Sequence, residues 1–425
     1  MEEGFQVIGY TPKYICNVGN LLPGEEYFLI IHNALTHVSD EEIVEIHSTQ
    51  PDGKEDLKSW CKLNSHIFLE SIDAGEYTKF IVQKGQHQAN FTSMPDWGVK
   101  LPRGKNGTIR LKDWLTGRMA KIMDQPHAYL GFVPRGAVAE AGNPEFTFAL
   151  HNADEVWTDN AADLYEQAKT SQWNPTTDIP WNELAELPED VEWAVCQIMT
   201  FLAENEFSAF YVPAKFLHRI HPHFIEPILF LATLVLDEAR HIEVFTKRAM
   251  ANGGGLQFSS VMTERSLHSL YIEEDYFKSS FMMHVLGEGT FLDLLQFIER
   301  HAPDEVTRKI VQLARQDEAR HVAYGIAHVR QQLINQPNLI HSLFETVEQR
   351  QQFVAAAAGG NSHTMEALAI LAGGGRQPEH IQKGFHAVKE LQAKMHENRI
   401  KRLVTIGLTE DQAMKISTLH TPNFM

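Results

Sequence analysis

The chain has 425 residues, of which 43% are hydrophobic, and its formal net charge is −18. This length allows two or three domains with cores of their own. The negative charge argues against nucleic acid or an anionic membrane as a main partner. The three cysteines, Cys16, Cys61 and Cys196, lie far apart without a CxxC pair, which excludes a disulfide framework and a zinc ribbon.

The first residues, MEEGFQVIGY, are acidic and have neither the basic nor the apolar region of a secretory signal. No uninterrupted apolar run reaches about 18 residues, the length that a membrane-spanning helix requires. We therefore expect a cytoplasmic protein without a membrane partner.

Residues 1–95 are predicted to form a small α+β domain, because short β-rich runs alternate with turn signals such as Pro51-Asp52-Gly53. One helix is predicted at Lys54–Leu63. The predicted strands are Tyr27–His32, Ile43–His47, His66–Glu70 and Tyr77–Val82.

Residues 96–159 are richer in glycine and proline and are predicted to connect two domains, with one helix near 111–123. From about residue 160 the hydrophobic pattern is helical. A helical bundle is predicted over 160–340, and further helices over 341–425 are expected to pack on it. The long helices of the bundle are predicted at 189–217, 224–251, 267–300 and 303–335, and the later ones at 341–357 and 379–404.

The pentapeptide DEARH occurs twice, at 237–241 and at 317–321, each time after an apolar run. It contains Glu-x-x-His, which places Glu238 with His241, and Glu318 with His321, on one face of a helix. A carboxylate and an imidazole at this spacing can bind one metal ion together. In di-iron and di-manganese carboxylate bundles, two helices each supply such a pair and two more supply one glutamate each.

Both additional glutamates are present. Glu288 lies in the apolar run FMMHVLGEGTFLDLLQF before the second copy, and FLAENEFSAF before the first copy offers Glu206 or Glu204. A single Glu-x-x-His is most often a surface ion pair. Burying four glutamates and two histidines without a metal would be very costly, so the joint pattern predicts a site for two metal ions. Oxygen and imidazole ligands suit iron or manganese.

The residues beside these ligands fit a supporting role. A histidine that binds a metal usually donates its other N–H group to a carboxylate, so Asp237 and Asp317 could each hold the histidine of the opposite copy. Arg240 and Arg320 would balance their charge. The alternative is ordinary pairing of Asp with Arg three residues apart on one helix.

At these residues the chain resembles the ferritin-like di-metal carboxylate oxidases and oxygenases. This superfamily includes the small subunit of ribonucleotide reductase, the ligand-binding oxidases related to it and the hydroxylases of bacterial multicomponent monooxygenases. The resemblance covers about residues 160–335 and includes LDEARHIEVF, QDEARHVAYG and LYEQAKTSQWNPTTDIPW. It implies a mainly α fold, with a ferritin-like four-helix bundle, extra C-terminal helices and a homodimer. The similarity of ENEFSAF to the monooxygenase pattern favours Glu206 over Glu204 as the ligand.

Two departures bear on activity. The radical-generating reductase subunits carry a tyrosine four residues after the first motif's histidine, where this chain has Phe245. The ligand-binding oxidases carry a tyrosine shortly before the third-helix glutamate, where this chain reads Phe281-Met282-Met283-His284. Both departures argue against the corresponding tyrosine chemistry. Tyr324, three residues after His321, is either an electron or proton relay or a packed core side chain.

The N-terminal residues 40–85 resemble the second half of the small sulfur-carrier domains of TusA type. Those domains carry Cys-Pro-x-Pro at the end of the first strand, a motif that this sequence lacks, and the first helix looks shortened. We therefore expect a docking or dimerisation module rather than a working sulfur carrier.

The leading hypothesis is an oxidase or oxygenase that activates O2 at two iron ions, or at a manganese and an iron ion, and oxidises a C–H or N–H bond of a small organic substrate. An external electron donor or reductase is expected. The alternatives are a ferritin- or rubrerythrin-like handler of iron or peroxide, a regulatory protein with a structural metal site and, against the evidence of Phe245, a radical-generating reductase subunit. The side chains expected to line a dry substrate pocket, or else simply to pack in the core, are Phe207, Phe210, Phe245, Phe291 and Leu292.

Overall fold

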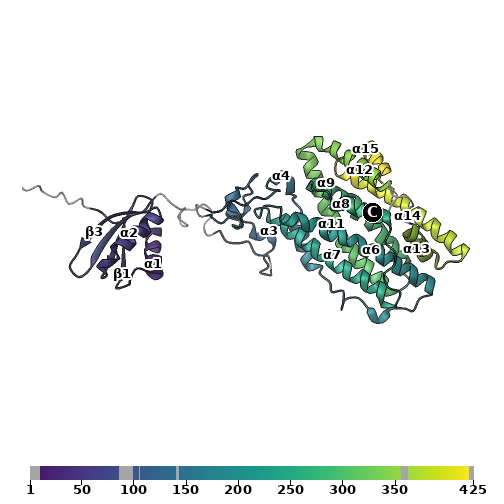
Figure 1. Ribbon diagram of the computed structural model, residues 1–425, viewed down its shortest axis with the longest axis horizontal. Coiled ribbons are helices and arrows are strands. Elements are labelled where there is room, and N and C mark those ends of the chain that lie inside the picture. The colour runs from purple at the N-terminus through teal and green to yellow at the C-terminus, as the bar shows by residue number, and fades with distance from the viewer. Residues whose placement is uncertain (1–9, 86–98, 105, 140–142, 356–361, 421–425) are drawn as a thin grey trace, which may run out of the picture. The chain divides into compact units, whose positions relative to one another are not determined.

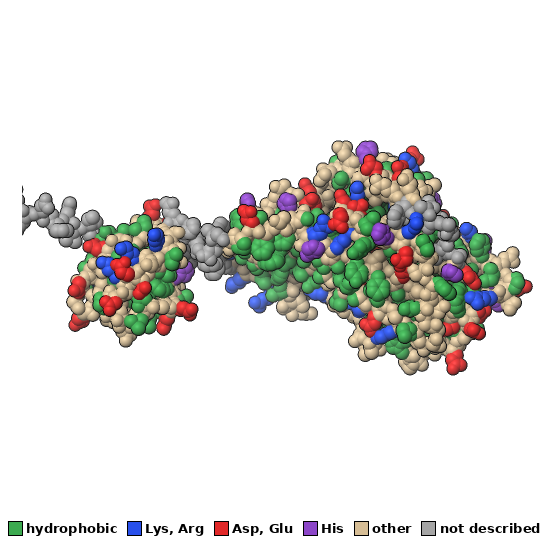
Figure 2. Space-filling model, viewed as in Figure 1, with side chains coloured by type: hydrophobic (Ala, Val, Ile, Leu, Met, Phe, Trp, Pro, Cys, Tyr) green, Lys and Arg blue, Asp and Glu red, His purple; other side chains and the backbone are tan. Residues whose placement is uncertain are grey.

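Figure 1 shows the computed structural model of the chain, which describes residues 10–85, 99–104, 106–139, 143–355 and 362–420. The chain divides into two compact units, Met1–Lys100 and Leu101–Met425. The first is a small α+β unit and the second is helical, which confirms the predicted fold class. None of the described helices is both long and apolar enough to cross a membrane. In Figure 2 acidic and basic side chains are interspersed over the visible face of each unit.

The N-terminal unit is a four-stranded sheet in the order β1-β2-β4-β3. Strands β1 and β2 are parallel, whereas β2 with β4 and β4 with β3 are antiparallel. Alternate residues of β2 and β4 face the core, where Val44 pairs with Val82 and Ile46 with Phe80. The elements in chain order are β1 (Tyr14–Gly19), α1 (Glu25–Thr36), β2 (Ile43–Ser48), η1 (Pro51–Gly53), α2 (Lys54–Leu63), β3 (Ile67–Asp73) and β4 (Thr78–Gln83).

The predicted strand Tyr27–His32 is wrong, because these residues lie in helix α1. A run of apolar residues fits a buried strand and a helix equally well. The buried positions decide between them, since Tyr27, Ile31, Ala34 and Leu35 follow helical spacing and pack in the core of the unit. Helix α1 has 12 residues, and strand β1 before it was not predicted.

The described residues between 101 and 159 pack on the helices of the second unit. Arg135 forms a buried ion pair with Glu226, with Nη2 and Oε1 2.7 Å apart, and the backbone of Leu150 pairs with Ile220. Because this segment belongs to the same compact unit as the helices, it is more than a connection. Its short helices are α3 (Leu111–Trp114), η3 (Gly117–Ala120), η4 (Ala128–Leu130) and α4 (Ala153–Val156).

The bundle contains three long helices at the predicted places, α6 (Glu189–Leu217), α7 (Ile225–Ala251) and α11 (Glu305–Asn335). Helix α11 begins where Asp304 accepts a hydrogen bond from the backbone N–H of Thr307. The predicted third helix, 267–300, is instead divided, because the chain leaves helical structure after Tyr271. The remaining elements of this part are α5 (Ala161–Thr170), η5 (Trp181–Glu183), α8 (Val261–Tyr271), α9 (Tyr276–Ser280), the π-helix η6 (Phe281–Glu288) and α10 (Gly289–His301).

The C-terminal helices pack on the bundle: α13 lies beside α6 (Figure 1), and α14 contacts α13 and α10. Ala369 and Gly384 meet at the α13–α14 contact, where a β-carbon on Gly384 would lie 1.8 Å from the Ala369 carbonyl oxygen. Helices α13 and α15 were not predicted, and part of the predicted loop AAAAGGNS lies outside the described residues. These elements are η7 (Pro337–Leu339), α12 (Ile340–Ala355), α13 (Ser362–Gly373), α14 (Pro378–Thr405) and α15 (Glu410–Leu419).

Candidate metal centre

Four elements of the bundle bring together four carboxylates and two imidazoles, all of them buried. Helices α6, α7 and α11 and the last residue of the π-helix η6 supply them. They form two overlapping groups whose donor atoms lie within 4.8 Å of one another. The six side chains are Glu206, Glu238, His241, Glu288, Glu318 and His321.

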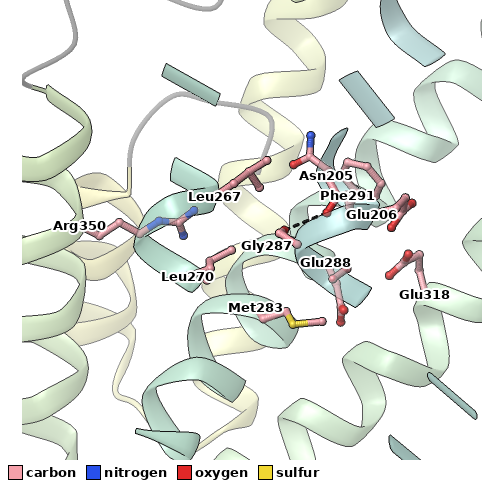
Figure 3. Close-up of a pocket in the computed structure, with 12 residues that line it drawn as sticks. Asn205, Glu206, Leu267, Leu270, Met283, Gly287, Glu288, Phe291, Glu318 and Arg350 are labelled. Atoms are coloured by element: carbon pink, nitrogen blue, oxygen red, sulfur yellow. Dashed lines mark hydrogen bonds between the residues drawn. The ribbon is translucent and has the colours of Figure 1, made fainter. Parts of the chain in front are cut away.

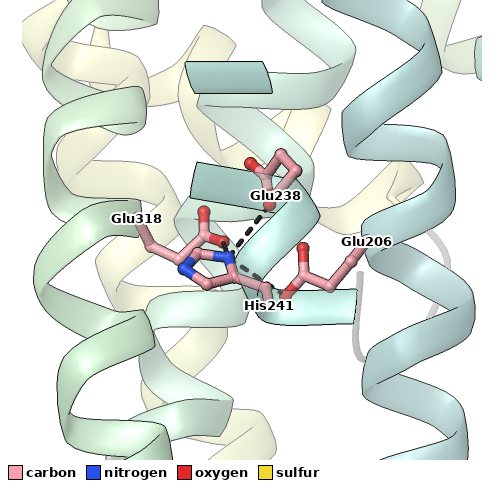
Figure 4. Close-up of side chains that lie close together, drawn as sticks. All are labelled: Glu206, Glu238, His241 and Glu318. Carbon is pink, nitrogen blue, oxygen red and sulfur yellow. Dashed lines mark hydrogen bonds and ion pairs between the residues drawn. The ribbon is translucent and has the colours of Figure 1, made fainter. Parts of the chain in front are cut away.

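The first group is centred on Nδ1 of His241. This nitrogen lies 3.0 Å from Glu238 Oε2, 3.4 Å from Glu318 Oε1 and 3.6 Å from Glu206 Oε1. Figure 4 shows the three carboxylates converging on the imidazole ring from separate helices.

The second group repeats this arrangement around Nδ1 of His321. The nitrogen lies 3.0 Å from Glu238 Oε1, 3.4 Å from Glu318 Oε2 and 3.9 Å from Glu288 Oε1. Glu238 and Glu318 therefore offer one oxygen atom to each group, as bridging carboxylates do, whereas Glu206 and Glu288 each belong to a single group.

The donor atoms fit a pair of metal ions. Glu206, Glu238 and Glu288 each have a buried carboxylate oxygen without a hydrogen-bond partner, and both oxygens of Glu318 lack one. Such groups are costly to bury unless they bind something. Oxygen and imidazole ligands bind iron or manganese at about 2 Å, so atoms that share one ion lie up to about 4 Å apart. The distances from each histidine Nδ1 to the carboxylate oxygens of its group, 3.0–3.9 Å, lie within this limit.

Charge repulsion and burial perturb the carboxylates when no cation is bound. Burial, together with Glu238 and Glu318, raises the pKa of Glu206 well above its ordinary value. Burial also raises the pKa of Glu288, against the opposing effect of His284. Two divalent ions would largely neutralise the four carboxylates.

On the side away from the centre, each histidine contacts the aspartate of the other DEARH repeat through Nε2. His241 Nε2 lies 3.2 Å from Asp317 Oδ2, and His321 Nε2 lies 3.3 Å from Asp237 Oδ2. The N–H group of each ring can therefore face an aspartate while Nδ1 faces the centre. This is the crossed arrangement that the sequence suggested.

The two arginines link the two repeats. Arg240 contacts Asp237 on its own helix and Asp317 on α11, the latter at 3.0 Å. Arg320 contacts Asp317 on its own helix and Asp237 on α7, the latter at 2.9 Å. The pairing of residues three apart and the pairing between repeats are therefore both present.

Trp173 belongs to the site and was not predicted. Its Nε1–H donates to Asp317 Oδ2 at 2.7 Å, and its ring stacks on His241. Arg240 lies over the same ring. The tryptophan precedes α6 by many residues, so helical spacing gave no sign of it. Its presence in the stretch similar to the ligand-binding oxidases was the only available signal.

The choice between Glu206 and Glu204 is decided by the direction of the two side chains. Glu206 is buried in the metal-ligating group, whereas Glu204 is partly exposed and accepts a hydrogen bond from Ser259. Residues that are two positions apart on an α-helix, as Glu204 and Glu206 are, point about 200° apart around the helix axis. Only one of the two can therefore face the centre. The alternative ligand Glu204 is therefore wrong.

His284 is a second unpredicted neighbour of the centre. Its Nδ1 lies 2.7 Å from Glu288 Oε2, and both residues lie in the π-helix. Gly325 of α11 makes room for His284, since a β-carbon there would lie 2.1 Å from that of the histidine. π-Helical segments are rare and often occur at functional sites.

Tyr324, the predicted relay or core residue, is fully buried. Its hydroxyl group hydrogen-bonds that of Tyr276, and its ring packs against Phe230 and edge-on against His284. It contacts no candidate ligand directly in these interactions. Among the contacts of the described residues, His284 lies between the tyrosine and Glu288.

A mostly apolar pocket opens onto the carboxylates (Figure 3). Phe291 lines it, as predicted, together with Leu267, Leu270 and Met283. Glu206, Glu288 and Glu318 lie at one end of this pocket and join it to the candidate centre.

The other predicted pocket residues lie elsewhere. Phe207 is 50% exposed and Leu292 is half-buried outside the pocket lining, because each follows an inward residue and is turned about 100° from it. Phe210 is also half-buried and does not line the pocket. Phe245 is fully buried, with its ring centroid 6.1 Å from that of His241, and packs in the core.

The N-terminal unit offers no accessible thiol. Cys16 and Cys61 are both buried in its core, and burial raises the pKa of Cys16 and raises that of Cys61 to about 12. A thiol that is buried and protonated is a poor nucleophile. At the turn between β1 and α1 the chain reads Gly19-Asn20-Leu21-Leu22-Pro23, without a cysteine.

No family model matches the chain. Among curated proteins, the "Putative sulfur carrier protein YrkI" of Bacillus subtilis (strain 168) is 38% identical over 52 residues, which is 12% of this chain and 69% of that protein. Through its N-terminal unit, this chain belongs to the family of that sulfur carrier protein. The resemblance seen in the sequence is thus confirmed, although this sulfur-carrier unit lacks the cysteine motif.

Solved structures similar to the chain include two variants of an R2-like ligand-binding oxidase. One, with an Fe/Fe cofactor, is 17% identical at a TM-score of 0.44, over 61% of this chain and 93% of that chain. The other, with a Mn/Fe cofactor, is 16% identical at a TM-score of 0.40 over the same shares. The case for a metal centre in the helical unit therefore rests on its own side chains.

Proposed function

We propose that the protein is a non-haem di-metal oxidase or oxygenase that uses O2 to oxidise a small organic substrate. The observation that carries this proposal is the joining of the six-residue donor set to an apolar pocket. A purely structural metal site has no need of such a pocket, because its ligands close around the ion.

In this proposal each half of the centre holds one ion. Glu206 and His241 would hold one ion and Glu288 and His321 the other, and Glu238 and Glu318 would offer one oxygen atom to each. Iron, or manganese with iron, suits these ligands, and such a pair supplies electrons for the reduction of O2.

The chain's own residues would position the substrate and control protons. Asp317 and Asp237 keep the Nε2–H form of each histidine, so that Nδ1 stays available as a ligand. The apolar lining formed by Leu267, Met283 and Phe291 excludes water from the reacting bond.

An external electron donor is also part of the proposal. Insertion of one oxygen atom of O2 into a C–H bond forms an alcohol, and the other oxygen atom leaves as water. This balance requires two electrons and two protons in addition to the pair of electrons from the bond. A cytoplasmic location and a homodimer stay predictions.

The test is to count metals and follow oxygen in one preparation. The full chain is purified without oxygen, loaded with Fe(II) and mixed with O2 while oxygen uptake and absorbance are recorded. We expect two irons per chain and an absorbance change that depends on oxygen, both lost in Glu238→Ala and both retained in the matched control Glu204→Ala.

Two results would contradict the proposal. Protein that holds no stoichiometric metal, or metal that is indifferent to O2, excludes an oxidase. Uptake of many irons per chain would instead support the storage alternative.

A further inference from the structure

The pocket has two chemically different ends. In Figure 3 the carboxylates of Glu206, Glu288 and Glu318 lie at one end, and the guanidinium group of Arg350 points into the pocket from the other. The side chains of Leu267 and Leu270 on α8 and of Met283 on η6 lie between them. Arg350 comes from α12, outside the helices that carry the candidate ligands.

The guanidinium group of Arg350 is buried and incompletely bonded. The residue is only 7% exposed, and among the described residues its one hydrogen bond runs from Nη2 to Ser266 Oγ at 2.6 Å. Nε and Nη1 have no hydrogen-bond partner there. Burial lowers the pKa of Arg350 to about 10, so the group keeps its positive charge at neutral pH.

Several other buried arginines of this chain have carboxylate partners, whereas Arg399 bonds the hydroxyl groups of Thr290 and Ser417. Arg248 binds Glu192 at 2.8 Å and Asp304 at 2.9 Å, and Arg135 binds Glu226. Arg350 has no such ion pair within the described ranges, although it faces a pocket. A buried charge without a partner destabilises the fold, and a ligand of opposite charge would offset that cost.

We propose that Arg350 binds the carboxylate group of the substrate, so that the substrate is an organic acid with an apolar body. Its acid group would lie at the Arg350 end, and its body along Leu267, Leu270 and Met283. The opposite end of the molecule would then lie beside Glu206 and Glu288, where the ions are expected. The bond that is oxidised is therefore remote from the acid group.

This inference rests on the proposed function, because it names the substrate class of the same site. A binding measurement separates the two. Hydrocinnamate, a phenyl ring on a two-carbon chain that ends in a carboxylate, is titrated into the metal-loaded full chain without oxygen, and then into metal-free chain. Its primary amide, of nearly equal shape but without charge, is the control ligand.

We expect the acid to bind about 10–100 times more tightly than the amide, as hydrogen bonds to charged groups allow. Arg350→Gln should abolish this preference while the amide binds as before. Arg399→Gln is the matched control, because Arg399 is also buried but bonds Thr290 and Ser417 and does not line the pocket.

A thermal melt gives a readout that a structural role would not produce. Without ligand, Arg350→Gln should melt at the same temperature or higher, because it removes a buried charge that has no partner. A preference for the acid that survives in Arg350→Gln would overturn the inference, as would failure of both ligands to bind. A further outcome is that the metal-free chain keeps the preference for the acid over the amide while the metal-loaded chain does not react with O2. That combination would support the carboxylate site at Arg350 and contradict the proposed oxidase.

Discussion

The two units of this chain relate structure to chemistry in opposite ways. The N-terminal unit is 38% identical to a sulfur carrier protein over 52 residues, yet its two cysteines are buried and the cysteine motif is absent. The helical unit matches no family model, yet six of its side chains assemble a complete donor set. Similarity over a whole fold reflects its packing, whereas an activity depends on a few side chains in contact.

The largest expected effect is the loss of both metal ions on removal of one bridging glutamate. Glu318→Ala deprives both groups of a ligand, so metal content should fall from two ions per chain to less than one. The measurement is metal analysis after desalting. Retention of both ions would show that the helical unit has no centre of the kind argued from its side chains.

Acid should destabilise the helical unit through His328. This histidine is fully buried, and burial lowers its pKa to about 4 from 6.5. Between pH 6.5 and 4 this histidine is protonated in the unfolded chain but stays neutral in the folded chain. The free energy of unfolding therefore falls as the pH falls from 6.5 to 4. One such group contributes about 3 kcal/mol over this range.

His328→Gln should remove this part of the pH dependence. Denaturant unfolding of both proteins at several pH values gives the difference. His328 Nε2–H donates to the carbonyl oxygen of Glu155, and Nδ1 hydrogen-bonds Ser280 Oγ, so the variant starts from a lower stability at neutral pH. An unchanged slope with pH would contradict the assignment.

Gly325→Ala tests whether close packing holds the π-helix in place. A β-carbon at Gly325 would meet His284, which contacts the candidate ligand Glu288. Overpacking costs about 1–3 kcal/mol, so the variant should be less stable although alanine favours helices. It should also bind less metal.

Gly24→Ala in the N-terminal unit is the control for that substitution. A β-carbon added at Gly24 would lie 3.8 Å from the Leu22 carbonyl oxygen, which is an ordinary van der Waals contact. Melting temperature and metal content should both stay near those of the parent protein. Equal effects of the two substitutions would mean that His284 is not held by this packing.

The smallest effect concerns the thiols. Cys16, Cys61 and Cys196 are all buried, so an aromatic disulfide reagent should label them only after denaturation. Cys16→Ala and Cys61→Ala should leave metal content and O2 uptake unchanged. Rapid labelling of Cys16 or Cys61 in the native protein would restore a sulfur-transfer role to the N-terminal unit.

The candidate ligands could be predicted because their spacing is local. Glu238 with His241, and Glu318 with His321, are three residues apart on helices, and an α-helix alone brings such pairs together. The crossed aspartates also followed from the repeat. Trp173, His284 and Arg350 could not be found in this way, since tertiary packing alone brings them to the site.

The wrong predictions share a physical cause. The run Tyr27–His32 fits a strand or a helix until its buried partners are known. Phe207 and Leu292 are near the ligands in sequence, but each follows an inward residue and faces away from it. Neighbours along a helix face different directions, so sequence adjacency does not indicate a shared pocket. Only the direction of each side chain separates Glu206 from Glu204.

The crossed aspartates have a consequence for how the centre fills. Asp237 of the first repeat steadies His321 of the second, and Asp317 steadies His241 in return. Ordering one half for its ion therefore also orders a group that the other half needs, which is a source of positive cooperativity between the two binding events. When iron is scarce, the population should divide into empty chains and filled ones, with few chains that expose a single redox-active ion.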